Sequence, residues 1–219
     1  VTEIVYALGT DKNLVGTDTS SVYPQAAMRL PQVGYQRRLS AEGVLSLKPT
    51  LVLMTAEAGP PAAVEQIEAA GVKIVKVGGE NTPDGAREKI REIAAALNEK
   101  ERGEQLIEKL DADLNAAKGC AAAFEAKPKV LFIYSRAGGA PQVSGANTSA
   151  YAMINLAGAQ NAVTGFENFK PLTPESLVEA APDFILFPSR GLDSIGGVEA
   201  VLKIPGMTET PAGKSGRII

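Results

Sequence analysis

A repeat within the chain is the feature that most constrains its fold, and the two copies lie 133 residues apart. Each copy begins with a hydroxyl residue, has a glutamate two positions later, and ends in a proline followed by an apolar run. The copies start at Ser40 and Thr173. A hydroxyl at the N-cap and a carboxylate in the first turn both favour the start of a helix. Each copy therefore predicts a short helix followed by a strand.

The predicted strands are continuously apolar, Leu-Val-Leu at 51–53 and Phe-Ile-Leu at 184–186. Such runs are typical of parallel strands that are covered on both faces. The interval is too long for a solenoid, whose units reach about 50 residues, so it indicates duplication of a whole lobe. The 219 residues suffice for two domains, since a domain needs about 100. We expect an α/β protein with two Rossmann-like lobes.

The longest helical pattern lies between the copies, from about Thr82 to Phe124. Apolar residues recur at helical spacing, the pattern breaks near Asn98, and it then resumes, which predicts two helices. The second would have about 25 residues and a length of about 38 Å. We expect an N-terminal lobe over residues 1–99, a connecting helix over 100–126 and a C-terminal lobe over 127–219.

Both ends of the chain lie inside predicted elements. Residues 1–9 have the pattern of an amphipathic helix that ends at Gly9, and Arg217-Ile218-Ile219 resembles the beginning of a strand. We therefore expect truncated termini. A segment that directs export would be absent from a processed chain.

Composition excludes several classes of partner. The formal net charge is −3 and no basic stripe is present, which argues against nucleic acid. No stretch approaches the roughly 18 apolar residues that span a bilayer, so we expect a soluble protein that is not inserted in a membrane. The single cysteine, Cys120, cannot form an internal disulfide.

The chain contains no histidine, which removes the Ser-His-Asp triad and the commonest axial ligand of haem iron. Tyrosine is then the leading donor. A phenol with a pKa of about 10 needs roughly 4 kcal/mol to ionise at pH 7, and a ferric ion beside an arginine can supply it. Tyr35 suits this role because it lies in a loop, where extended backbone would place its hydroxyl on the same side as the Arg37 guanidinium. Arg190 follows the second apolar run, where open α/β sheets bind ligands.

Other assignments stay open at this point. Tyr134, at the end of a predicted strand, and Tyr23 are further candidates for cleft residues. Tyr35 has a structural interpretation as a half-buried aromatic side chain with a satisfied hydroxyl. A structural interpretation, as solvated surface charges, also exists for Arg37, Arg38, Arg136 and Arg190. Glu42 and Glu175 need do no more than stabilise the helix starts.

The chain resembles the periplasmic haem-binding proteins of bacterial haem ABC importers, the HmuT, ShuT and PhuT group. This group lies within the larger family of cobalamin- and siderophore-binding proteins. The resemblance covers nearly the whole chain and is most specific from Leu30 to Arg37 and on through Pro49. Ser189 to Leu192 and Val143 to Gly145 support it.

The resemblance implies two α/β lobes joined by a long helix, with one ferric haem in the cleft between them. Tyr35 would be the axial ligand through its phenolate. Tyr134 stays a further candidate for haem binding because of its place at the end of a predicted strand. Arg37 and Arg190 would be the cationic partners of the phenolate and the haem propionates, in an order that is left open.

The resemblance also implies partners and a location. Glu42 and Glu175 would dock onto arginines of the ABC permease, which works with its ATPase subunits. The protein would be a periplasmic monomer that delivers haem and catalyses no reaction. A second stacked haem held by histidine is excluded, because this chain has none.

Two alternatives remain. A siderophore or cobalamin carrier of the same fold would use Trp and Arg clusters, and the chain has no Trp. An α/β cleft enzyme, such as a chelatase, would need histidine or paired carboxylates at strand ends, and the sequence has neither pattern.

Overall fold

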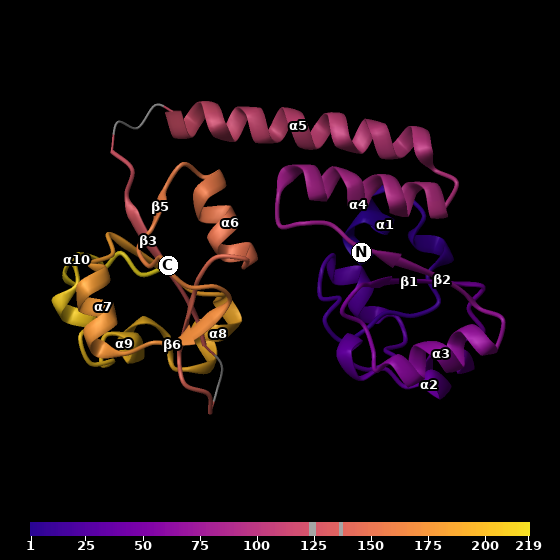
Figure 1. The fold of residues 1–219 in the computed structure, drawn as a ribbon, viewed down its shortest axis with the longest axis horizontal. Helices are drawn as coiled ribbons and strands as arrows, with labels where there is room; N and C mark the ends of the chain where they lie inside the picture. Colours follow the sequence, from indigo (N-terminus) through magenta and orange to yellow (C-terminus); the bar gives the residue numbers. More distant parts are fainter. Residues whose placement is uncertain (123–125, 136–137) are drawn as a thin grey trace. The chain divides into compact units, whose positions relative to one another are not determined.

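The computed structural model describes residues 1–122, 126–135 and 138–219 (Figure 1). The chain divides into two compact units, Val1–Ala112 (unit 1) and Asp113–Ile219 (unit 2). Both contain helices and parallel strands, which confirms the expected two-lobed α/β fold. The boundary falls inside helix α5 (Lys100–Ala122). Residues 123–125, which include Phe124 and part of the expected connecting helix, lie outside the described residues.

Unit 1 is built on a two-stranded parallel sheet, in which β1 (Leu51–Thr55) pairs with β2 (Lys73–Val77) from Leu51↔Lys73 to Thr55↔Val77. Helices α1 (Thr2–Ala7) and α4 (Pro83–Ala96) pack on the face that carries Leu53 and Val75. Helices α2 (Ala41–Ser46) and α3 (Pro61–Ala69) pack on the face that carries Val52 and Ile74. The continuous apolar run is thus explained, because alternate side chains enter two separate cores.

The two copies of the repeat adopt the same local structure. Ser40 accepts a hydrogen bond from the Gly43 amide at 3.1 Å, and Thr173 accepts one from the Ser176 amide at 3.2 Å. These side chains cap α2 and α7 (Pro174–Ala180), as predicted. The likeness extends to the helix ends, where Lys48 and Ala181 both take positive φ, at 50° and 43°. Each directly precedes the proline that follows its helix.

Unit 2 has a mixed sheet centred on β3 (Lys129–Tyr134). β3 pairs in parallel with β5 (Gln160–Asn161) and β7 (Phe184–Leu186). The parallel pairing predicted for the apolar run at 184–186 is confirmed, whereas the antiparallel pairing of β4 (Gln142–Ser144) with both β3 and β6 (Phe169–Pro171) was not predicted. The helices are α6 (Ser149–Leu156), α7, α8 (Ser189–Ser194), α9 (Gly197–Val201) and α10 (Pro211–Lys214).

The buried core of unit 2 gathers apolar side chains from β3, β4, β7 and the helices around them. Its members include Leu131, Ile133, Val143, Leu177, Ile185, Val201 and Met207. Short 3-10 helices also occur, at Asp11–Asn13, Gln25–Arg29 and Gln36–Arg38 in unit 1 and at Met207–Glu209 in unit 2.

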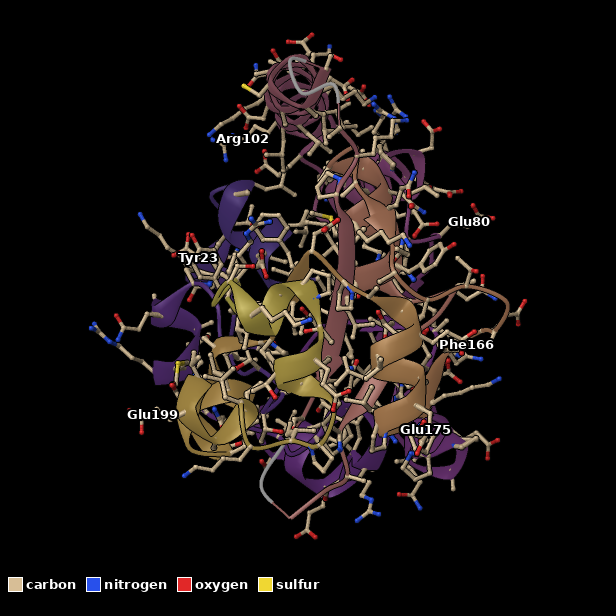
Figure 2. All side chains as sticks on the ribbon, turned by 90° about the vertical axis from the view of Figure 1, so that its left-hand side faces the viewer. Tyr23, Glu80, Arg102, Phe166, Glu175 and Glu199 are labelled. Carbon is tan, nitrogen blue, oxygen red and sulfur yellow. The ribbon has the colours of Figure 1, made fainter. Side chains whose placement is uncertain are left out.

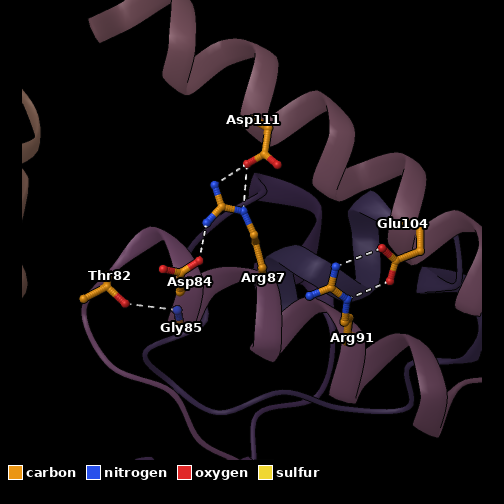
Figure 3. A network of polar contacts seen from close by, with 7 residues as sticks. All are labelled: Thr82, Asp84, Gly85, Arg87, Arg91, Glu104 and Asp111. Atoms are coloured by element: carbon orange, nitrogen blue, oxygen red, sulfur yellow. Dashed lines mark hydrogen bonds and ion pairs between the residues drawn. The ribbon is translucent and has the colours of Figure 1, made fainter.

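Helices α4 and α5 confirm the predicted pair and its break, where Asn98 has a φ of 60°. Arg87 donates to Asp111 on α5 at 2.6 and 2.8 Å, and Arg91 donates to Glu104 at 2.8 and 3.0 Å (Figure 3). The first part of α5 is therefore bound to unit 1 by two arginines of one helix.

The elements at both chain ends match their sequence patterns. Helix α1 ends at Ala7, and Gly9 follows its C-cap with a φ of 71° and an amide that donates to the Tyr6 carbonyl. Ile218 forms a parallel bridge with Ile185 of β7, as expected of a strand that begins there. No helix in the described part of the chain is long and apolar enough to cross a membrane.

Candidate functional site

Tyr35 lies in a loop of unit 1, the Tyr35 loop (Gly34–Leu39), and the residue is 44% exposed. The expectation of extended backbone through Arg37 was wrong. Residues Gln36–Arg38 form a 3-10 turn that is closed by a hydrogen bond of 2.7 Å from the Arg38 amide to the Tyr35 carbonyl. The alternation that would align Tyr35 with Arg37 is absent, because it requires a strand.

The backbone of the Tyr35 loop is held by residues from other parts of unit 1. The Gly34 carbonyl accepts from the Thr19 amide at 2.9 Å. The Gln36 carbonyl accepts from the Gly59 amide at 2.9 Å, and the Leu39 amide donates to the Gly59 carbonyl at 2.8 Å. The Gln36 side chain also accepts from the Thr55 hydroxyl at 3.0 Å. Tyr35 thus projects an exposed phenol from a main chain that is fixed on both sides.

The predicted arginines are exposed. Arg37 and Arg38 lie in the turn after Tyr35, and Arg190 lies in the first turn of α8. None of the three forms an ion pair with another described residue. Their guanidinium groups are therefore open to an anionic ligand as well as to water. Arg136 lies outside the described residues.

In unit 2, Tyr134 and Arg190 lie at the same end of the sheet. Tyr134 is the last residue of β3 and is 40% exposed, and α8 begins just after the parallel strand β7. A Cβ atom on Gly191 would lie 2.6 Å from the Ser135 carbonyl oxygen. The start of α8 therefore packs directly against the chain that follows Tyr134. This is the carboxyl edge of the strands, where α/β sheets bind ligands.

An aromatic side chain beside Tyr134 was missed by the sequence analysis. The ring of Phe169, on β6, lies 5.8 Å from the Tyr134 ring at an angle of 53°. Phe169 reaches this position because β6 pairs with β4, which pairs with β3. The antiparallel pairing was not predicted, so no pattern in the sequence joined the two residues.

The segment Val143 to Gly145, which supports the resemblance to the haem-binding group, has a packing role. A Cβ atom on Gly145 would lie 2.5 Å from the ring of Phe166, which is labelled in Figure 2. The Gly145 amide donates to the Asn168 carbonyl at 2.7 Å. A glycine at this position lets β4 approach the segment that leads into β6.

Glu42 and Glu175 are exposed in the first turns of α2 and α7, one in each unit. Glu175 is labelled in Figure 2. Tyr23, the other tyrosine considered as a cleft residue, is labelled there too; it is 66% exposed and precedes Pro24. The two glutamates occupy equivalent places in the repeat. Their position suits both helix stabilisation and contact with another protein.

Unit 1 also contains a cavity of about 820 Å³ between β1, the start of α1 and residues 13–23. Asp18, Gln36 and Thr55 line it, whereas Tyr35 does not. Gln36 and Thr55, which are hydrogen-bonded to each other and help to hold the Tyr35 loop, therefore face this cavity. Among the described residues, no group of three or more Cys, Asp and Glu side chains is placed to hold a metal ion.

Both the sequence and the structure of this chain match known proteins. A sequence model described as periplasmic binding protein matches residues 1–219. The apo structure of the periplasmic haem-binding protein RhuT from Roseiflexus sp. RS-1 is 46% identical, with a TM-score of 0.95 over 100% of this chain and 84% of RhuT. The uncharacterized ABC transporter substrate-binding lipoprotein YvrC of Bacillus subtilis (strain 168) is 29% identical over 99% of this chain and 68% of its own.

The solved structure of the haem-binding protein HmuT is 30% identical, with a TM-score of 0.87 over 99% of this chain and 72% of HmuT. HmuT has also been solved as single alanine variants of a histidine, a tyrosine and an arginine. The tyrosine lies 99 positions after the histidine, and the arginine lies two positions after the tyrosine. The chain belongs to the periplasmic binding protein family.

Proposed function

We propose that this chain is the substrate-binding component of a bacterial haem ABC importer, which binds ferric haem and delivers it to an inner-membrane permease. The observation that carries the proposal is the similarity to RhuT, a periplasmic haem-binding protein that is 46% identical over the whole chain.

Tyr35 is the proposed axial ligand, through its phenolate. Its phenol is exposed while the backbone on both sides of it is held. A ligand on a fixed backbone loses little conformational freedom when it binds iron.

Three residues of this chain have the same spacing as the residues that were varied in HmuT. In this chain Tyr134 lies 99 positions after Tyr35, and Arg136 lies two positions after Tyr134. The intervals equal those between the histidine, tyrosine and arginine of HmuT. We propose that Tyr134 also contacts the haem, because it lies at the carboxyl end of β3, where α/β sheets bind ligands.

Arg37 and Arg190 are the proposed cationic partners. Both are exposed and free of ion pairs with other described residues. A guanidinium group can donate two parallel hydrogen bonds to a carboxylate, which is the group that haem propionates offer. One arginine would hold propionates, and the other would stabilise the phenolate.

Glu42 and Glu175 are the proposed contacts with arginines of the permease, which works with ATPase subunits. The equivalent, exposed positions of the two acids, one in each unit, support this role. The protein would act as a monomer in the periplasm and would have no catalytic activity. The description of RhuT as periplasmic supports that location.

A haemin titration tests the function. We expect purified protein to give the visible spectrum of high-spin ferric iron bound by a phenolate, and the Tyr35→Phe variant to lose it. Tyr6→Phe, a substitution on α1, is the matched control. An unchanged spectrum in Tyr35→Phe would remove Tyr35 as the ligand.

Two further arms address the alternatives. Cobalamin and a ferric siderophore are titrated in parallel, and tighter binding of either one than of haemin would overturn the haem assignment. Tyr134→Phe is expected to keep the phenolate spectrum. Its loss in this variant alone would make Tyr134 the ligand instead.

A further inference from the structure

Two exposed aromatic rings lie on one face of the sheet of unit 2. Gln142 of β4 pairs with Tyr134 of β3 and with Pro171 of β6, so these residues form one row across three strands. Directly paired side chains lie on the same face, as do side chains two positions apart in a strand. Phe169 lies two positions before Pro171 and therefore shares this face with Tyr134.

The core of unit 2 lies on the opposite face. The adjacent row across the strands consists of Ile133, Val143 and Lys170. Ile133 and Val143 belong to the buried core, with exposed fractions of 0% and 4%. Tyr134 and Phe169, by contrast, are 40% and 42% exposed. The packing of the core therefore gives no reason for a large apolar side chain at position 169.

The two rings contact each other, and we call Tyr134 and Phe169 the aromatic pair. Their centroids are 5.8 Å apart and their planes are inclined at 53°, which is a favourable geometry for two aromatic side chains. Because β4 separates β3 from β6, the rings meet across β4. The aromatic pair is therefore one small apolar surface at the carboxyl end of β3.

Size and charge together indicate what covers the aromatic pair. Two aromatic side chains bury at most about 500 Å², which is less than the roughly 800 Å² that each partner contributes to a stable protein interface. A small ligand is thus the better fit. Arg190, at the same edge of the sheet, forms no ion pair with another described residue and can bind a carboxylate. A flat apolar molecule with carboxylate groups matches both features, as haem does.

We propose that Phe169 is a specificity-determining residue that contacts the apolar porphyrin ring together with Tyr134. The proposal rests on the function argued above, in which the ligand is haem. In this arrangement the aromatic pair contacts the macrocycle, whereas Tyr35 binds the iron. Phe169 thereby favours a flat tetrapyrrole over a corrin, whose ring is puckered and substituted on both faces and loses much of this contact.

The test uses metal-free protoporphyrin IX beside haemin, which separates contact with the ring from coordination of the iron. We expect Phe169→Ala to weaken the binding of both ligands by the same factor, about 5- to 100-fold, which is the contribution of an aromatic side chain stacked on a flat heterocycle. Tyr35→Phe should weaken the binding of haemin alone. Equilibrium titrations followed by porphyrin absorbance give the dissociation constants.

Two further variants are matched controls. Phe169→Tyr keeps the ring, and Val178→Ala shortens another exposed apolar residue of unit 2, on α7. Both should bind the two ligands within twofold of the wild type. An affinity of Phe169→Ala for protoporphyrin IX within twofold of the wild type would overturn the proposal. Weaker binding of haemin alone would overturn it as well, because the residue would then act through the iron.

Phe169→Leu covers the case in which Phe169→Ala does not fold, because it keeps an apolar side chain and loses only the ring. It should also bind protoporphyrin IX more weakly than the wild type, and an equal affinity would contradict the proposal. NMR of the wild type gives a direct measurement. The ring protons of Phe169 should shift upfield when protoporphyrin IX binds, and unchanged shifts would exclude contact with the macrocycle.

The titrations also distinguish this proposal from its alternatives. If Phe169→Ala binds both ligands as the wild type does but no longer stimulates the permease ATPase, the aromatic pair is a docking surface for a protein and the proposal fails. Failure of the proposed function has a different result, since the wild type itself would then bind neither haemin nor protoporphyrin IX.

Discussion

Two buried hydroxyls in unit 2 differ in whether their oxygens are bonded. Ser144, on β4, is 1% exposed and its hydroxyl has no hydrogen-bond partner. Thr148 is 7% exposed, donates to the Gly145 carbonyl at 2.8 Å and accepts from the Tyr151 amide at 3.1 Å. An unpaired buried hydroxyl is unfavourable, whereas a bonded N-cap stabilises its helix.

We expect Ser144→Ala to raise the free energy of unfolding by about 1 kcal/mol, because it removes a desolvated group that has gained no bond. Thr148→Ala should lower it by about 1 kcal/mol, because α6 loses its cap. Urea denaturation of the two variants and the wild type measures both. A destabilised Ser144→Ala protein would show that its hydroxyl is bonded in solution.

At the residue scale, local chemistry was predictable from sequence. Ser40 and Thr173 cap their helices as expected, because an N-cap depends on the residue itself and on the next three. The positive φ of Lys48 and Ala181 was not expected, since neither is glycine or asparagine. The turn at Gln36–Arg38 was missed for a related reason, because hydrogen bonds with distant residues such as Gly59 shape it.

Helix α5 carries two glycines in different surroundings. A Cβ atom on Gly103 would lie 2.6 Å from the Ala94 Cβ on α4, while one on Gly119 would meet nothing within 4 Å. Gly103 therefore allows the close contact between the two helices. Gly119 only weakens the helix that contains it.

The same substitution should consequently have opposite effects at these positions. We expect Gly103→Ala to destabilise the protein by about 1–3 kcal/mol through overpacking. Gly119→Ala should stabilise it by up to about 1 kcal/mol through helix propensity. Thermal and urea denaturation provide the measurement. A Gly103→Ala protein as stable as the wild type would mean that α4 and α5 separate without cost.

The contact between Arg91 and Glu104 should make the packing of α5 on α4 sensitive to acid. A hydrogen bond from Arg91, together with its charge, lowers the pKa of the Glu104 carboxyl from 4.5. Because the folded-state pKa is the lower one, the contact stabilises above pH 4.5 and is lost as the pH falls through the folded value. Glu104→Gln should therefore be less stable than the wild type at pH 7 and equally stable once both carry a neutral group.

Urea midpoints of Glu104→Gln and the wild type provide the check. They are measured at pH 7 and again well below pH 4.5, where residue 104 is neutral in both proteins. A constant difference between the two proteins at all pH values would contradict the assignment. Added salt at pH 7 should reduce the difference, since exposed ion pairs are screened.

At the element scale, long periodic segments were predictable and short strands were not. The patterns of α4 and α5 extend over several turns and identify them without tertiary information. Strands β4 and β6 have three residues each, Gln-Val-Ser and Phe-Lys-Pro, which is too short for a period to be read. The position of Phe169 beside Tyr134 depends on these strands and was therefore invisible.

At the scale of the whole molecule, the proposed delivery of haem depends on Glu42 and Glu175 together. We expect a Glu42→Gln, Glu175→Gln double variant to bind haemin as the wild type does and to lose stimulation of the permease ATPase in vesicles. The matched control replaces Glu68 and Glu179, which are exposed glutamates further along α3 and α7. Impaired haem binding in the first variant would show that the two acids belong to the haem site instead.

The passage from unit 1 to unit 2 takes place inside a single uninterrupted helix, because the boundary between Ala112 and Asp113 lies within α5. Helix formation is cooperative, because each turn supports the backbone hydrogen bonds of the next. The parts of α5 that belong to unit 1 and to unit 2 therefore form one hydrogen-bonded run from Lys100 to Ala122. A substitution that breaks the helix near this boundary would consequently affect both units at once.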